Sequence, residues 1–429
     1  MKIQKLIRPE KTFIVMMCCL AMNLLAQGQS QHALTLQQCY TLANQNYPLV
    51  KQMALIEKTS EYSLENASRG FLPQVSLNGQ ITYQSEVIEF PISSPDVAIP
   101  ALRKDQYKIY AEVSQSLTDA HTIKQQKELL RANTAADQQN LEVALFQLKE
   151  RINQLFFGIL LLDAQLEQTE IIKTDIRSGI KRANASIANG TALKSSADIL
   201  QAELLKTDQR TVELQANRKG YADMLALFIG QTIEENTVFQ TPPSETIPTE
   251  INRPELKLYD LQQKSFEIQD RLITARNIPR LSFFLQGGYG RPTLNVLTNE
   301  FGFYYIGGLR LGWNLSGFYT SSGERQLQTL NRQSIAVQRE TFLFNTNLSL
   351  RQQNAEIVKL QQLMTTDDQI IALREKVKET TASQLENGTI TTTDYLTNVN
   401  AEDQARQNLL LHKVQLLMAQ YNYKTTSGN

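Results

Sequence analysis

The amino-acid sequence predicts a mainly α-helical protein with a β-barrel part, built from two tandem repeats that each supply two strands and one very long helix. Three observations predict this fold class. Apart from Pro9, the twelve prolines lie between residues 48 and 100 or between 242 and 292, which leaves two long tracts where helices can form. Heptad-spaced apolar residues run through both tracts. Motifs of the first half recur in the second half at nearly constant offsets.

The chain opens with a segment typical of a secretory signal peptide, assigned to residues 1–28. Basic residues precede an apolar run over 13–22, and the small residues Ala26 and Gly28 suit cleavage before Gln29. No later stretch approaches the roughly 20 apolar residues that a transmembrane helix needs. The protein is therefore expected to be exported, and to enter a membrane only as strands.

Composition excludes several functional classes. Without the signal peptide the charge balance is slightly negative, which argues against a nucleic-acid partner, since that binding relies on excess Lys and Arg. Cys39 would be the only cysteine left, so no intrachain disulfide can form. The three histidines show no metal-ligand spacing, and no Gly-x-Ser-x-Gly elbow occurs. The sequence therefore predicts neither an enzyme nor a bound cofactor or metal.

Both proline-free tracts carry a heptad seam that predicts a long helix packed along a neighbour. The first seam consists of Leu141, Leu145, Leu148, Ile152, Leu155, Ile159, Leu162 and Leu166. The second repeats every seven residues at Leu343, Leu350, Ile357, Met364 and Ile371, with polar neighbours such as Thr346, Gln353 and Asp367. An ordinary elongated bundle would show the same seams, so they indicate a coiled coil without indicating a function.

The internal repeat has two registrations. Pro48 precedes Pro73 by 25 residues, and Pro254 precedes Pro279 by the same interval. At an offset of 198, a strand ends at Leu117 and at Leu315, and the turn Asn189-Gly190-Thr191 matches Asn387-Gly388-Thr389. We therefore predict a first repeat over 29–240, a linker over 241–252 and a second repeat over 253–429. Strands are expected at about 73–84, 107–118, 280–290 and 303–316, with long helices at about 119–188 and 324–387.

The four predicted strands alternate apolar and polar residues, as in Val75-Ser76-Leu77-Asn78. A soluble sheet could show the same alternation, but no helix pattern beside the strands offers an apolar cover. Trp313, Tyr289, Tyr304 and Tyr305 add aromatic residues of the kind found at membrane interfaces. The alternation therefore favours lipid on one face and water on the other. Four strands are too few to close a membrane barrel, for which about eight is the lower limit, so the chain must oligomerise, and three copies would supply twelve strands.

These residues resemble the TolC-type outer-membrane efflux family over essentially the whole mature chain. Leu34-Thr35-Leu36 followed by Tyr47-Pro48 is similar to the family's opening helix, and Arg-Pro-Glu-Leu at 253–256 to its counterpart in the second repeat. The turn Asn-Gly-Thr followed by Asp-x-Leu occurs twice, and the segment 419–423 completes the match. Each motif alone is weak, whereas their doubled order at matched spacing is specific.

The resemblance implies a homotrimer with a twelve-stranded barrel in outer-membrane lipid, continued by a periplasmic coiled-coil tunnel. It implies docking to a periplasmic adaptor (membrane fusion) protein and an inner-membrane pump of the RND or ABC type. The expected function is that of the outer-membrane channel of a tripartite efflux or type I secretion system in a Gram-negative bacterium. Drugs, metals, lipids and secreted proteins remain open as cargo. The alternative is a trimeric coiled-coil surface or adhesive protein, which would not need two equal repeats with paired strands.

The resemblance also places a periplasmic aperture beside the two glycine turns. Its expected residues are Gly190, Asp198, Asn387, Gly388, Asp394 and Thr397. Asp394 stands where the family has the first aspartate of Asp-Val-Leu-Asp, but Thr397 replaces the second and Ile390 replaces a basic residue, which argues against a tight charged lock. For Asp394, pore lining and helix capping both stay open, and for Asp198 capping is favoured.

Overall fold

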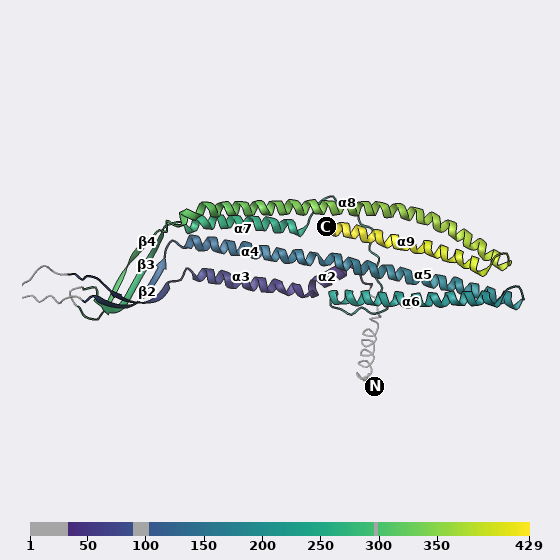
Figure 1. The fold of residues 1–429 in the computed structure, drawn as a ribbon, viewed down its shortest axis with the longest axis horizontal. Helices are drawn as coiled ribbons and strands as arrows, with labels where there is room; N and C mark the ends of the chain where they lie inside the picture. Colours follow the sequence, from purple (N-terminus) through teal and green to yellow (C-terminus); the bar gives the residue numbers. More distant parts are fainter. Residues whose placement is uncertain (1–32, 89–102, 296–298) are drawn as a thin grey trace, which may run out of the picture. The chain divides into compact units, whose positions relative to one another are not determined.

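A computed structural model describes residues 33–88, 103–295 and 299–429. The predicted signal peptide over 1–28 and its cleavage site lie outside these residues. The described part is mostly helical, with one four-stranded antiparallel sheet, as the sequence predicts (Figure 1). No helix among the described residues is both long and apolar enough to cross a membrane.

The chain divides into two compact units. The first, here called the strand unit, consists of Lys51–Ala144 and Arg253–Asn345. The second, called the hairpin unit, contains the chain up to Val50 together with Leu145–Asn252 and Thr346–Asn429. Each unit contains segments of both predicted repeats, because the chain of each repeat passes through both units.

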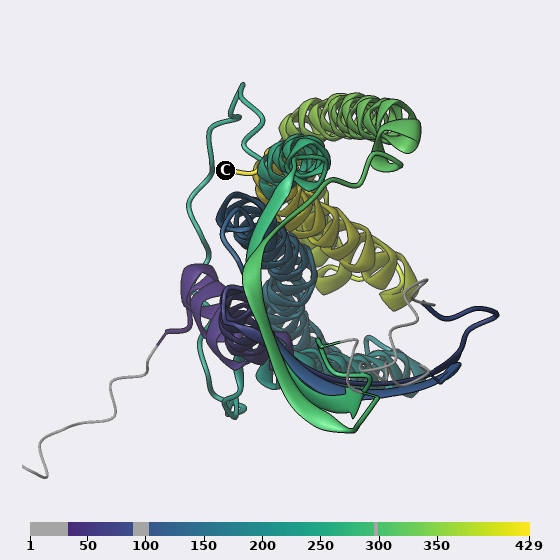
Figure 2. The same ribbon diagram turned by 90° about the vertical axis from the view of Figure 1, so that its left-hand side faces the viewer.

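The strand unit contains all four strands, which form one sheet (Figure 2). The order of the strands in it is β1-β2-β3-β4. Its strands are β1 (Gln74–Tyr83), β2 (Asp105–Ser116), β3 (Arg280–Arg291) and β4 (Gly302–Gly312). Its helices are α3 (Lys51–Arg69), α4 (Ala120–Phe146), α7 (Pro254–Arg276) and the first part of α8 (Gly317–Glu386). Since every neighbouring pair is antiparallel, β1 and β4 also run in opposite directions and form the two open edges.

The hairpin unit is built around α5 (Leu148–Ala188), which packs against α6 (Lys194–Ile229), α2 (Leu36–Asn46) and α9 (Thr392–Ser427). The short helix η1 (Pro48–Val50) and the later part of α8 belong to the same unit. Its main core includes the fully buried Phe156 and Phe157 of α5, and Cys39 of α2. Burial raises the pKa of the Cys39 thiol to about 12, so this cysteine remains a thiol and acts as a small core residue.

Local sequence explains where several helices begin. Thr35 caps α2 in a reciprocal pair with Gln38, each side chain accepting a hydrogen bond from the other residue's backbone N–H. Pro254 occupies the first turn of α7, where a missing N–H costs nothing. At the far end of α6, Gly230 ends the helix with a φ of 67°.

Two helix boundaries differ from the prediction. The long helix expected at about 119–188 is divided into α4 and α5 at Gln147, although Gln147 keeps right-handed helical angles (φ −64°, ψ −18°). The helix expected at about 324–387 begins earlier, at Gly317, and passes through Gly323. A single exposed glycine lowers helix propensity by about 1 kcal/mol but does not stop a helix of 70 residues.

The heptad seams predict which residues are buried. In α5, Ile152 and Ile159 are 1% and 0% exposed, and in α8 Ile357 is 1% exposed. Of the polar neighbours on α8, Asp367 is buried and Gln353 is half-buried, and both have partners on α9. Gln353 donates to Thr426 through its side-chain amide at 3.0 Å, and Asp367 pairs with His412.

Candidate functional site

The sheet presents one apolar face and one polar face, because its register aligns alternate residues of all four strands. Val75 of β1 lies beside Val113, which lies beside Leu285. The apolar face carries Val75, Leu77, Ile81, Tyr83, Tyr107, Ile109, Ala111, Val113, Leu281, Phe283, Leu285, Tyr289, Phe303, Tyr305, Leu309 and Leu311. Leu77 is 74% exposed and Phe303 87% exposed, so no described segment covers this face.

Aromatic side chains gather at both ends of the apolar face. At the end with the strand-connecting loops, Tyr289 stacks with Phe301 at 5.8 Å between ring centroids and contacts Phe303 at 4.9 Å. At the other end, Trp313 contacts Phe318 at 6.1 Å and donates its indole N–H to the carbonyl of Asn277. Such girdles flank the apolar band of outer-membrane strands.

The opposite face carries most of the polar and charged residues of the strands, whereas Gln115 and the ion pair of Arg291 with Asp105 lie at the ends of the apolar face. Arg310 makes two hydrogen bonds to Glu112, at 2.9 and 3.4 Å, and its guanidinium lies 4.3 Å from the ring centre of Phe284. Tyr304 also lies on this face, in register with Gly288, and is thus separated from Tyr289 and Tyr305 on the apolar face. At Gly288 an added Cβ would lie 2.6 Å from the Cβ of Tyr110, so glycine allows this close packing.

The two glycine turns have the same geometry. Gly190 and Gly388 follow α5 and α8 with φ angles of 72° and 68°, a conformation that strongly favours glycine. In the first turn the Gly190 N–H bonds to Ile187 and the Thr191 N–H to Ser186. In the second, the N–H groups of Gly388 and Thr389 bond to Leu385 and Gln384 in the same pattern. Both turns are therefore Schellman motifs, and Asn189 and Asn387 are the C-caps.

Asp394 lies in the first turn of α9 and takes part in its cap. The actual N-cap is Thr391, whose hydroxyl accepts the Asp394 N–H at 3.2 Å and donates to Asp394 Oδ2 at 2.6 Å. The backbone N–H of Thr391 also donates to this carboxylate, at 3.0 Å. These hydrogen bonds, from the hydroxyl first and the backbone second, lower the pKa of Asp394. The Asp394 side chain is exposed, and its lowered pKa keeps the carboxylate ionised at neutral pH.

The other expected aperture residues behave differently. Thr397 is exposed and donates its hydroxyl to the carbonyl of Thr393. Asp198 lies in the second turn of α6, whose N-cap is Leu193. The capping interpretation of Asp198 is therefore wrong, because a side chain in that position is too far along the helix to reach the free amides of the first turn.

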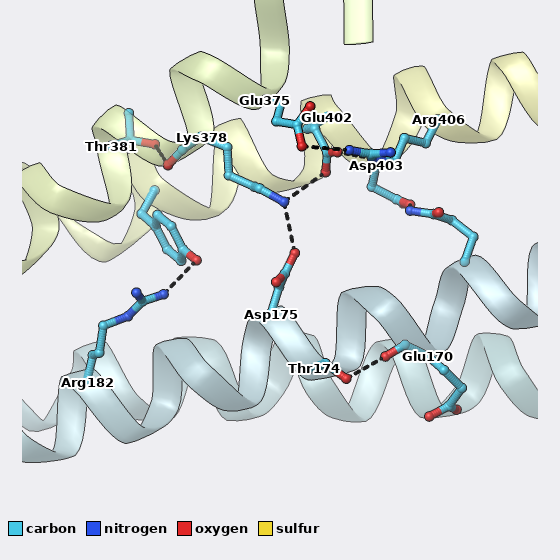
Figure 3. Close-up of polar contacts among 12 residues, drawn as sticks. Glu170, Thr174, Asp175, Arg182, Glu375, Lys378, Thr381, Glu402, Asp403 and Arg406 are labelled. Carbon is cyan, nitrogen blue, oxygen red and sulfur yellow. Dashed lines mark hydrogen bonds and ion pairs between the residues drawn. The ribbon is translucent and has the colours of Figure 1, made fainter. Parts of the chain in front are cut away.

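Behind the turns, charged residues connect α5, α8 and α9 (Figure 3). Lys378 of α8 contacts Asp175 of α5 at 3.1 Å and Glu402 of α9 at 3.3 Å. Arg406 of α9 also pairs with Glu402, and reaches Glu375 of α8 at 3.3 Å. We call these five residues the charge cluster. Its centre is buried, since the Glu402 side chain is only 4% exposed.

The electrostatics of the charge cluster favour its ionised form. Burial would lower the pKa of Lys378, but its hydrogen bonds and charge interactions with Asp175 and Glu402 outweigh burial and raise it. The pKa of Arg406 is raised in the same way, because Glu402 outweighs the effect of burial. Closer to the turns, Arg182 of α5 contacts the hydroxyl of Tyr395 and the carboxylate of Glu386, each at 3.3 Å. Three helices are therefore held together by paired charges.

Solved structures resemble this chain over most of its length. CusC matches with a TM-score of 0.68 and 14% identity over 92% of each chain. VceC, an outer membrane protein of Vibrio cholerae, matches with a TM-score of 0.66 and 14% identity over 92% of this chain and 96% of that chain. The outer membrane channel MtrE of Neisseria gonorrhoeae, in its open state, matches with a TM-score of 0.64 and 13% identity over 92% and 89%. No protein-family model and no curated protein matches the chain.

The chain has the fold of the TolC-type outer-membrane channels. The resemblance predicted from the doubled motifs is therefore confirmed at the level of the fold. In this chain each glycine turn joins two long helices, α5 to α6 and α8 to α9. Within the described residues, no group of three or more His, Cys, Asp and Glu side chains could hold a metal ion.

The charge cluster was not predicted from the sequence. One signal was present, since Lys378 continues the heptad of Ile357, Met364 and Ile371 at the next seventh position. A lysine on an otherwise apolar seam predicts a buried acidic partner. Its partners Asp175 and Glu402 could not be identified from the sequence, because they come from two other helices.

Proposed function

We propose that this protein is an outer-membrane channel of a Gram-negative bacterium, through which solutes leave the periplasm without a chemical step. The observation that carries this proposal is the sheet with its uncovered apolar face and its charged opposite face. Lipid satisfies the first face and water the second, while aromatic side chains at both ends suit the two interfaces. The likeness to the outer membrane channel MtrE supports the same function.

The proposal includes a homotrimer. Four strands leave two open edges, and unpaired backbone groups at those edges would be costly in lipid. Because β1 and β4 run in opposite directions, the β4 of one copy can pair with the β1 of the next and continue the antiparallel pattern. Three copies would supply twelve strands, an even number as in bacterial outer-membrane barrels.

We further propose that the glycine turns lie at a periplasmic entrance and that Asp394 faces the pore there. The exposed, ionised carboxylate of Asp394 supports this role, and three copies would form an acidic ring that favours cations. The lack of a second acid at Thr397 makes this ring weaker than a double one. A periplasmic adaptor and an inner-membrane pump of the RND or ABC type would supply the cargo and the energy.

Conductance through planar lipid bilayers, with the native mass of the detergent-extracted complex, tests the proposal. We expect stepwise single-channel currents and the mass of a trimer. A trimeric surface or adhesive protein would give the same mass without currents. A stable monomer in a lipid environment would contradict both the trimer and the channel.

A further inference from the structure

The hairpin unit contains a cavity remote from the glycine turns. It has a volume of about 810 Å³ and lies between α5, α6 and the segment 233–241 that follows α6. Cavities of roughly 300–1,000 Å³ are the size of typical ligand sites. Glu167, on its α5 wall, precedes Gly190 by 23 residues, or about 35 Å along a helix. The cavity is therefore a separate surface from the proposed entrance.

The wall formed by segment 233–241 is held in place by Arg218 of α6. Its guanidinium donates to the backbone carbonyls of Glu235 and Thr237, both at 2.9 Å, and pairs with Asp163 of α5. The same group lies 5.7 Å from the ring centre of Phe239, a core residue that is 6% exposed. These contacts fix the cavity before any ligand arrives, which reduces the entropy lost on binding.

The lining combines apolar surface with excess negative charge. Its apolar part consists of Leu160, Ala164, Leu166, Ala222, Ile233, Val238 and Phe239. Once Arg218 has neutralised Asp163, four carboxylates remain at the rim and form no ion pair among the described residues, at Glu167, Asp223, Glu234 and Glu235. Lys219 is the single base left beside them. The rim therefore has a net charge of about −3 near neutral pH.

We propose that this cavity binds a basic, partly apolar peptide segment of a partner protein. The four carboxylates are spread over α5, α6 and the segment 233–241, so a ligand with a single positive charge could pair with only some of them. A short chain segment with several Lys or Arg side chains can pair with all of them, while its apolar side chains contact Leu160 and Val238. Paired charges would fix the orientation of the bound segment and raise its association rate, and the apolar contacts would slow its dissociation.

A labelled peptide of alternating lysine and leucine tests the site by fluorescence anisotropy with the full chain in detergent. We expect saturable binding that weakens as salt is added, because the rim charges are exposed. The double change Asp223→Asn and Glu234→Gln should weaken binding roughly threefold to tenfold, as expected for the loss of two exposed ion pairs. Glu213→Gln is the matched control, since Glu213 is an exposed acid of α6 outside the lining, and should have no effect.

A second change tests the apolar part of the same cavity. Ala164→Phe places a ring in the cavity without altering its charge, and we expect it to weaken peptide binding as well. The proposal is overturned if the peptide does not bind, if the double variant and Glu213→Gln bind it equally, or if the monovalent cation tetraphenylphosphonium displaces it fully. Bilayer conductance of the same variants should match the wild type, so failure here is distinct from failure of the channel proposal.

Discussion

Lys378 is the residue of the charge cluster whose ion pairs join all three helices, and replacing it with methionine tests the cluster. Methionine keeps an unbranched side chain of similar length but loses the contacts to Asp175 and Glu402. Breaking a buried pair costs roughly 3–5 kcal/mol. Here Asp175 is one-third exposed and Glu402 keeps Arg406 as a partner, so we expect a smaller loss of about 2 kcal/mol in the local opening free energy.

Amide hydrogen exchange of the full chain measures this local free energy. A loss of about 2 kcal/mol should speed exchange roughly thirtyfold in α5 around Asp175 and in α9 around Glu402. Exchange of the Phe156 region should not change, because that core lies in another part of α5. In the folded protein the pKa of Lys378 is raised above its ordinary 10.5. Its contribution to stability is therefore complete below pH 10.5 and is lost only as the pH rises through its pKa in the folded protein.

Lys359→Met is the matched control on the same helix. Lys359 pairs with Glu356 one turn away, and both side chains are about half exposed, so its replacement should cost less than about 0.5 kcal/mol. A double-mutant cycle with Glu402→Gln should give a coupling energy above roughly 0.5 kcal/mol. Equal exchange in the Lys378→Met and Lys359→Met variants would refute the view that the cluster holds the three helices together.

Three further predictions concern the turns, the strands and the entrance. Gly388→Ala should destabilise the second turn by roughly 1–2 kcal/mol because of its φ of 68°. Gly323→Ala, in open space within α8, should instead stabilise the protein by roughly 0.5–1 kcal/mol. The unfolding temperatures of the two variants should therefore shift in opposite directions, and shifts of one sign would contradict the backbone argument. Leu77→Arg should make membrane assembly less favourable by about 2–4 kcal/mol of free energy. Ser76 is in register with Glu112 on the other face, so Ser76→Arg should assemble normally. Equal yields of folded trimer from the two variants would disprove the assignment of the faces. Asp394→Asn should reduce cation selectivity and block by divalent ions in bilayers. Thr391→Ala removes the cap but keeps the charge, so it should leave both properties unchanged. If both variants lose selectivity, Asp394 acts only through the cap.

The sequence alone determined those features that depend on short-range geometry. Proline positions delimit the helical tracts, because proline breaks helices wherever it occurs. Asn-Gly-Thr predicts a turn at Gly190 and at Gly388, because only glycine easily takes the required positive φ. Alternation along a single strand, as from Val75 to Asn78, is enough to predict two unlike faces. The doubled order of these motifs then predicted the TolC-type fold.

Tertiary structure decided what depends on more than one element. Gln147 gives no local signal for the division of the first long helix. Lys378 finds its partners on two other helices, and the cavity beside Arg218 exists only because segment 233–241 folds back over α5 and α6. Local propensity fixes each helix and strand along the chain, whereas burial and charge pairing depend on which segments meet in space.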